Sequence, residues 1–216
     1  MNQLLPSLDE LDHHAEIQPE FARWRTGYGP FEHALETQAA VFRLAHQLVQ
    51  AELQPDLASV YRLLQAIDRI GSAGLWLVVH MTYARRVRLD GSELSVEDFK
   101  AAPEGHTGGS LNMVPAYAGY LGLNALTGST RAWLMGQGHC VAAIEALNLL
   151  TDNLHPEQKQ AYGGGEAGIN RLLEDFYGYH QAADGSPSAP LGSHVNAHTG
   201  GGIAEGGYLG FAELQY

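Results

Sequence analysis

"MGQGHCVAAIEALNLL" (residues 135–150) places one histidine among glycines, directly ahead of a long apolar run. The short apolar stretch 133–135 leads into it, so the segment is typical of a strand, a glycine loop and a helix in succession. Open α/β folds bind ligands at such junctions. On this stretch alone, His139 is either a residue that contacts a ligand or an ordinary polar side chain at the start of a helix.

The second half of the chain repeats this arrangement. Residues 1–100 contain five glycines, whereas residues 101–216 contain 21. The glycine-rich segments "GHTGGSLN" (105–112) and "GSHVNAHTGGGIAEGG" (192–207) each precede an apolar run of helical character. This alternation of glycine loops with apolar helices and short strands predicts an α/β fold with a partly parallel sheet.

The first half is predicted to be helical. Pro30 stands where a first-turn proline would open a helix over residues 31–53, and Asp56 is a candidate N-cap for the helix that follows. Residues 75–87 contain β-branched side chains that would suit a buried strand, but the length of the run favours a buried helix.

Two domains follow from this change of character. Residues 1–99 are expected to form a helical N-terminal region, in which Ser95 and Asp98 have the spacing of a capping box. Residues 100–216 are expected to begin a parallel-sheet α/β domain.

Composition excludes several classes of partner. The net charge of −12 argues against a nucleic acid or an anionic membrane surface, which would need clustered lysine and arginine. The chain has neither an apolar run long enough to span a membrane nor the basic-then-apolar order of a signal peptide.

Three side chains outside the glycine loops are not expected to take part in catalysis or ligand binding. The single cysteine, Cys140, cannot form an internal disulfide, which fits a reducing cytoplasm, and its apolar neighbours predict a buried structural thiol. His13 and His14 lie in an acidic N-terminal segment and are expected to be solvated.

The glycine loops carry the candidate chemistry. Each contributes one candidate histidine: His106, His139 and His194. Glycine lets the backbone approach a ligand closely, free amides at a helix start can hold an anion, and imidazole can donate, accept or carry a proton near neutral pH. The sequence therefore predicts one pocket lined by these three histidines.

A metal site at these histidines is not predicted. His194 and His198 have a spacing that could place two ligands on one helix face, but Gly200–Gly202 disfavour a helix there. The glutamate of a zinc-protease motif is also missing.

Four motifs in order resemble a known family. "GHTGG" (105–109), "GQGH" (136–139), "SHV" (193–195) and "EGGYLG" (205–210) resemble the N-terminal domain of phosphoketolases, which are thiamine-diphosphate enzymes related to transketolase. The resemblance covers residues 100–216 well and the rest loosely. It is nearest to a bacterial branch labelled xylulose 5-phosphate 3-epimerase or phosphoketolase-like.

The resemblance implies a function. Such an enzyme cleaves the C2–C3 bond of a ketose phosphate such as xylulose 5-phosphate, using thiamine diphosphate with Mg²⁺, and inorganic phosphate can accept the two-carbon fragment. By resemblance, His106, His139 and His194 contact sugar hydroxyls and move protons. The backbone around Gly206, Gly207 and Leu209 contacts the cofactor. A cytoplasmic homodimer is implied by the same analogy.

The chain departs from the family pattern at several positions. Ala204 stands where the family has histidine, Tyr208 where it has glutamate, and Thr107 and Gly109 where the first loop has tryptophan and threonine. A sugar-phosphate epimerase or a ketol transferase on the same scaffold therefore stays open.

The acidic Gly-Asp-Gly motif that binds magnesium in the family has no counterpart here. We therefore expect these 216 residues to be an N-terminal fragment of a longer enzyme, inactive alone, with the magnesium ligands outside this chain. A stand-alone, non-catalytic helper domain is the alternative from a different class.

Overall fold

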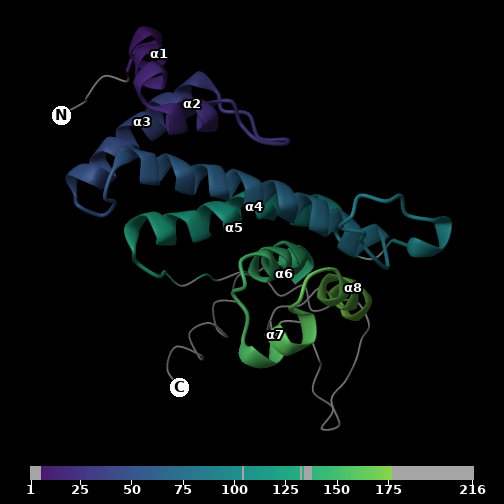
Figure 1. Ribbon diagram of the computed structural model, residues 1–216. Coiled ribbons are helices and arrows are strands. Elements are labelled where there is room, and N and C mark those ends of the chain that lie inside the picture. Colours follow the sequence, from purple (N-terminus) through teal and green to yellow (C-terminus); the bar gives the residue numbers. More distant parts are fainter. Residues whose placement is uncertain (1–5, 104, 132, 134–137, 177–216) are drawn as a thin grey trace. The chain divides into compact units, whose positions relative to one another are not determined.

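The computed structural model describes residues 6–103, 105–131, 133 and 138–176 (Figure 1). Regular secondary structure within these residues is helical throughout. The elements, in chain order, are α1 (Leu8–Ile17), α2 (Pro19–Arg25), α3 (Leu35–Gln50), α4 (Leu57–Tyr83), the 3-10 helix η1 (Val96–Asp98), α5 (Thr107–Thr127), the 3-10 helix η2 (Gly138–Cys140), α6 (Val141–Leu150), α7 (Pro156–Tyr162) and α8 (Glu166–Asp175).

The prediction of an α/β fold is wrong for the described residues. Extended pairing there is limited to two isolated bridges, Tyr28 with Phe31 and Ala84 with Phe99. Residues 151–176, where an α/β fold would place its next strand, form α7 and α8 instead. The reason is that a glycine loop ahead of an apolar helix requires only a reversal of the chain, and a preceding helix supplies that reversal as well as a strand does.

Local helix signals in the first half were more reliable. The Oδ1 atom of Asp56 accepts a hydrogen bond from the amide of Ser59 at 2.7 Å, so the predicted cap of α4 is confirmed. α4 then continues to Tyr83, which confirms a helix rather than a strand over most of residues 75–87.

The start of α3 differs from its prediction. Gly27 and Gly29 adopt positive φ values of 76° and 58°, which turn the chain back on itself. The amide of Phe31 then donates to the carbonyl of Tyr28 at 3.0 Å and is not available to begin a helix. α3 consequently starts at Leu35 rather than just after Pro30.

The structure divides into two compact units. Unit 1 takes residues 1–72 together with 118–131, and unit 2 takes residues 73–117 together with the segment from 132 onward. α4 and α5 each contribute residues to both units. The predicted domain boundary between residues 99 and 100 stays a prediction.

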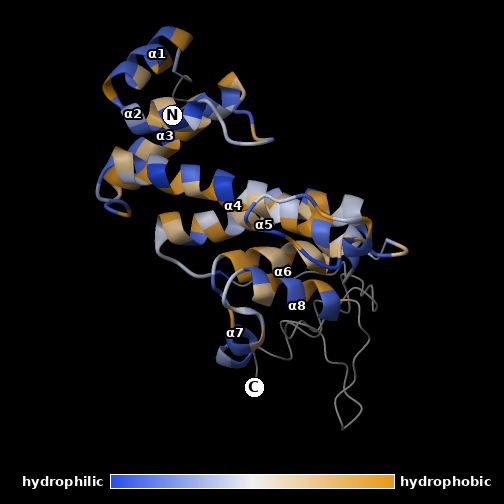
Figure 2. Cartoon of the chain, turned by 45° about the vertical axis from the view of Figure 1, so that its right-hand side comes forward, coloured by the Kyte–Doolittle hydropathy of each residue, from blue (hydrophilic) through white to orange (hydrophobic). Residues whose placement is uncertain are grey.

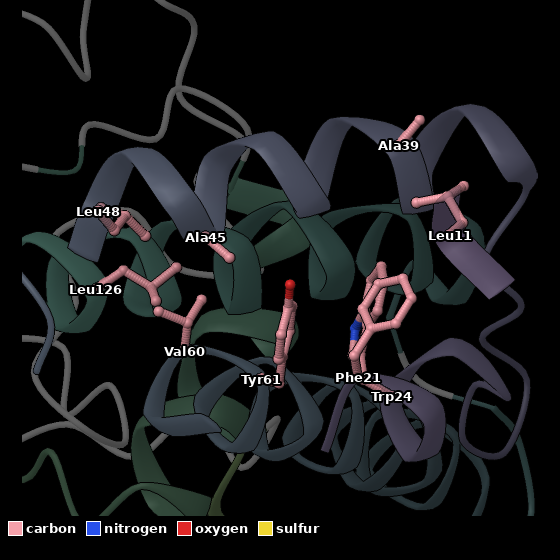
Figure 3. Close-up of a cluster of buried hydrophobic side chains, with 9 residues drawn as sticks. All are labelled: Leu11, Phe21, Trp24, Ala39, Ala45, Leu48, Val60, Tyr61 and Leu126. Atoms are coloured by element: carbon pink, nitrogen blue, oxygen red, sulfur yellow. The ribbon is translucent and has the colours of Figure 1, made fainter. Parts of the chain in front are cut away.

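Unit 1 has an aromatic core (Figure 3). Buried side chains from α1, α2, α3, α4 and α5 form one cluster, whose members are Leu11, Phe21, Trp24, Ala39, Ala45, Leu48, Val60, Tyr61 and Leu126. His14 is also buried here, and its Nε2 atom lies 2.9 Å from the Tyr61 hydroxyl. The expectation that His14 is solvated is therefore wrong, whereas His13 is exposed as expected.

Unit 2 is organised around α6, the most apolar of the short helices (Figure 2). Leu147 of α6 packs so closely on α4 that a Cβ atom added at Gly74 would lie 2.9 Å from its Cδ2 atom. The hydroxyl of Tyr117 in α5 donates to Asn148 of α6 at 2.9 Å. None of the helices in the described part of the chain is long and apolar enough to cross a membrane.

Candidate functional site

Two of the three predicted histidines lie next to each other in unit 2. The ring centroids of His106 and His139 are 4.6 Å apart, with an interplanar angle of 64° that gives an edge-to-face arrangement. His106 precedes α5 and His139 belongs to η2 ahead of α6. The two glycine loops therefore bring one imidazole each to a common place, which we call the histidine pair.

His106 caps α5. Its Nδ1 atom accepts a hydrogen bond from the amide of Gly109 at 3.0 Å, and its carbonyl accepts from the amide of Ser110. Since Nδ1 must present a lone pair to that amide, the neutral ring carries its proton on Nε2. The side chain is exposed, so this Nε2–H group is a donor available to a ligand.

His139 is held through its backbone rather than its ring. Its carbonyl accepts a hydrogen bond from the Ser110 hydroxyl at 3.2 Å, which ties η2 to α5. The ring is half-buried. In the part of the chain that the structure describes, neither ring nitrogen of His139 has a hydrogen-bond partner.

Gly109 makes this approach possible. A Cβ atom at this position would lie 2.8 Å from Nδ1 of His106 and 3.0 Å from Cδ2 of His139. It would also lie 2.9 Å from Sγ of Cys140. The contacts to His106 and Cys140 are shorter than a carbon atom tolerates and the one to His139 is tight, so a side chain at this position would force its neighbours to move.

We expect Gly109→Ala to separate the two rings and to lower the free energy of unfolding by about 1–2 kcal/mol. Urea unfolding followed by circular dichroism measures the second effect. Gly108→Ala is the matched control, because nothing lies within 4 Å of a Cβ atom there, and alanine should raise stability slightly through its helix propensity. Equal behaviour of the two variants would contradict the contact described here.

Cys140 is a buried structural thiol, as the sequence indicated. Its side chain is 3% exposed, and burial raises the pKa of the thiol. A raised pKa leaves less of the nucleophilic thiolate at neutral pH, so Cys140 is not suited to nucleophilic chemistry.

The other predicted site residues, His194, Gly206, Gly207 and Leu209, lie outside the described residues. The same holds for His198. Within the described ranges, no group of three histidine, cysteine, aspartate or glutamate residues is placed to hold a metal ion.

The sequence reasoning missed a polar neighbour of the first loop. The Thr107 hydroxyl donates to the hydroxyl of Tyr83 at 3.4 Å, so the last residue of α4 lies beside the start of α5. Tyr83 is 42% exposed and could reach a ligand at this edge. No sequence signal marked it, because Tyr83 lies far from the loop along the chain.

A buried acid was also missed. Glu145 of α6 is 2% exposed, its Oε2 atom has no hydrogen-bond partner in the described structure, and burial raises the pKa of the carboxyl well above its usual range. The carboxyl also helps to raise the pKa of Tyr162 to about 12, where burial is the largest cause and Asp175 the next. In the sequence, the position of Glu145 within an otherwise apolar run was the signal that could have indicated its burial.

Because the folded state favours the protonated acid, Glu145 supports stability fully below its ordinary pKa near 4.5, and this support is lost as pH rises. We expect Glu145→Leu to raise the free energy of unfolding by about 2 kcal/mol at pH 8 and by less at pH 4. Urea titrations at both pH values measure it. The exposed Glu174→Leu should change little at either pH, and a loss of stability in Glu145→Leu at pH 8 would refute the expectation.

Comparison with known proteins agrees with the motif order. A family model described as the XFP N-terminal domain matches residues 60–215, which is more than half of the chain. A protein of Schizosaccharomyces pombe named "Probable phosphoketolase" is 28% identical over 159 residues, which make up 73% of this chain and 17% of that protein. The chain thus spans less than a fifth of that relative's length. No solved structure matches the chain.

Proposed function

Since this chain belongs to the XFP N-terminal domain family, the N-terminal region of phosphoketolases, we propose that it contributes part of the active site of a thiamine-diphosphate-dependent phosphoketolase-like enzyme. The reaction is cleavage of the C2–C3 bond of a ketose phosphate such as xylulose 5-phosphate, with inorganic phosphate as the acceptor. A homodimer in the cytoplasm belongs to the same proposal.

One observation supports this proposal above the others. Imidazoles from two separate glycine loops lie with their ring centroids 4.6 Å apart, above a glycine that leaves no room for a side chain. Packing in a core does not require an exposed imidazole. A pair of histidines with uncommitted ring nitrogens at an accessible edge is suited to contact neighbouring hydroxyls of a sugar.

The two rings have different tasks in this proposal. His106 is a hydrogen-bond donor through Nε2–H, because Nδ1 is engaged by Gly109. It therefore suits a sugar oxygen that gains negative charge. The ring nitrogens of His139 have no partner in the described residues, so this ring can accept a proton from a hydroxyl and return it. His194 is proposed to complete the pocket.

The described residues fit the substrate side of such a site and not the cofactor side. They offer imidazoles and a glycine floor, and no group of acids among them is placed to hold Mg²⁺. When bound, thiamine diphosphate would supply the nucleophilic carbon that adds to the ketose carbonyl. Its contacts are proposed at Gly206, Gly207 and Leu209, and these 216 residues alone are proposed to be inactive.

Product analysis of the full-length protein tests the proposal. The protein is incubated with xylulose 5-phosphate, thiamine diphosphate and Mg²⁺, with and without inorganic phosphate. We expect acetyl phosphate and glyceraldehyde 3-phosphate only when phosphate is present. Formation of ribulose 5-phosphate would identify an epimerase, and transfer of the two-carbon unit to an added aldose would identify a ketol transferase. An unconsumed substrate would contradict all three.

A further inference from the structure

A second polar site lies in unit 1 and shares no residue with the motifs discussed above. A cavity of about 570 Å³ opens along α2 and α4 and is lined by Glu20, Arg23, Arg62, Gln65 and Arg69, among others. We call it the arginine cleft. None of its residues belongs to the histidine pair or to the glycine loops.

The arginines of the cleft differ in their partners. Nη1 of Arg23 donates to both carboxylate oxygens of Glu20 at 2.9 Å, so this charge is neutralised locally. Arg62 donates a hydrogen bond to the hydroxyl of Ser59 at 3.0 Å and interacts electrostatically with the carboxylates of Glu20 and Asp56 without contacting them directly. Arg69 lies over the ring of Tyr28, 5.6 Å from its centroid. In the described structure neither Arg62 nor Arg69 forms an ion pair.

These two arginines lie on one face of α4. Residues seven apart on a helix project in nearly the same direction, and Gln65 lies between them on that face. Its Nε2 atom is fixed by the backbone carbonyl and the carboxylate of Glu20, each at 3.0 Å. The cleft therefore has an ordered wall, and two of its guanidinium groups form no direct ion pair in the described structure.

The charge of the side chains that line this cleft is opposite in sign to the net charge of the chain. The chain carries a net charge of −12, and most of its surface repels anions. The cleft is lined by three arginines and one glutamate, so a positive charge remains there that can attract an anion. The planar fork of arginine matches the oxygens of a phosphate group better than any other side chain does.

A smaller cavity adjoins the cleft and extends the argument. It measures about 200 Å³, shares Arg23, Gln65 and Arg69 with the larger cavity, and is also lined by Trp24, Tyr28 and Asp68. Asp68 Oδ2 is bound by Nε2 of His33 at 2.9 Å. Trp24 is buried and stacks on His33, whereas the exposed ring of Tyr28 and the fixed carboxylate suit the carbon skeleton and hydroxyl groups of a sugar.

We propose that unit 1 binds a small phosphorylated sugar in the arginine cleft, with the phosphate held by Arg62 and Arg69 and the sugar in the adjoining cavity. The site is separate from the proposed catalytic one, because the two share no residue and belong to different units. A bound ligand here would have a regulatory or stabilising effect rather than a chemical one.

Isothermal titration calorimetry of this chain tests the site, with ribose 5-phosphate, inorganic phosphate and ribose as probes at 0.15 M salt. We expect ribose 5-phosphate to bind more tightly than inorganic phosphate and ribose to show no binding. Arg62→Gln/Arg69→Gln should weaken ribose 5-phosphate binding at least tenfold. Arg85→Gln/Arg171→Gln removes the same charge from exposed positions outside the cleft and should leave the affinity unchanged.

The outcomes that overturn the proposal are distinct. Absence of ribose 5-phosphate binding to the unaltered chain would refute it, as would equal weakening by both arginine pairs. Binding that survives Arg62→Gln/Arg69→Gln but disappears in His106→Ala/His139→Ala would assign the ligand to the histidine pair instead. Circular dichroism of each variant shows whether its fold is retained, and the single variants Arg62→Gln and Arg69→Gln serve if the double variant does not fold.

Discussion

Replacing His139 by alanine is expected to lower turnover of xylulose 5-phosphate at least a hundredfold in the full-length protein, with little change in stability. The expected size is that of a lost proton-transfer group. Stability should persist because the half-buried ring has no hydrogen bond among the described residues, and η2 is held to α5 through the carbonyl of His139, which alanine retains.

Steady-state kinetics and urea unfolding measure the two effects separately. His13→Ala is the matched control, since it removes an exposed imidazole from a different unit. Retained turnover in His139→Ala would remove this residue from the proposed mechanism. A large loss of stability would instead show that the ring packs as a structural element.

Acidification is expected to weaken unit 1 through His14. Burial is the main cause that lowers the pKa of His14 to about 4, and the nearby His46 and His13 add to it. Nε2 of His14 shares a hydrogen bond of 2.9 Å with the Tyr61 hydroxyl, and burial also raises the pKa of this phenol. The folded state therefore resists a proton that the unfolded chain accepts near pH 6.5.

The sign follows from this difference. His14 leaves stability intact above pH 6.5, and the free energy of unfolding falls as pH drops from there toward 4. At about 1.4 kcal/mol per unit of pKa difference, the full loss amounts to about 3 kcal/mol. Urea titrations at pH 7.5 and pH 4.5, followed by tryptophan fluorescence, measure the change, because Trp24 lies in the same cluster.

His14→Leu should flatten this pH dependence, whereas His13→Leu should change it much less, because burial is the largest cause of the lowered pKa and His13 the last of the three. The leucine variant loses the hydrogen bond to Tyr61, so its stability at pH 7.5 is expected to be lower. If His14→Leu keeps the full acid sensitivity of the unaltered chain, another group is responsible.

Sequence reasoning succeeded where the deciding interaction is local. The cap at Asp56, the capping box of Ser95 and Asp98, and the helical continuation to Tyr83 all depend on residues within a turn or two of each other. Burial of Cys140 followed from its apolar neighbours. Such signals depend only on a few residues that are neighbours along the chain.

Prediction from the sequence was wrong where the structure depends on contacts between segments that are distant along the chain. The glycine loops predict an α/β fold, but a loop of this kind can follow a helix as well as a strand. His14 was misjudged for a related reason. In the structure a capping box of Ser7 and Glu10 begins α1, and Leu11 and His14 share the buried face of this helix. The hydroxyl that contacts the imidazole belongs to Tyr61, 47 residues away along the chain.

The candidate site shows both sides of this distinction. Two of the three predicted imidazoles lie together, and Gly109 leaves the room for their contact. Loop composition marked the histidines. It did not mark Tyr83 or Glu145, which the fold brings into unit 2 from other helices.

Leu126 completes the cluster around Tyr61, although it lies well beyond the other members along the chain. During translation, the cluster is therefore complete only after α5 has been synthesised, and part of its apolar surface stays open to solvent until then. A peptide cut at residue 99 would lack Leu126 and would keep that part of the surface exposed.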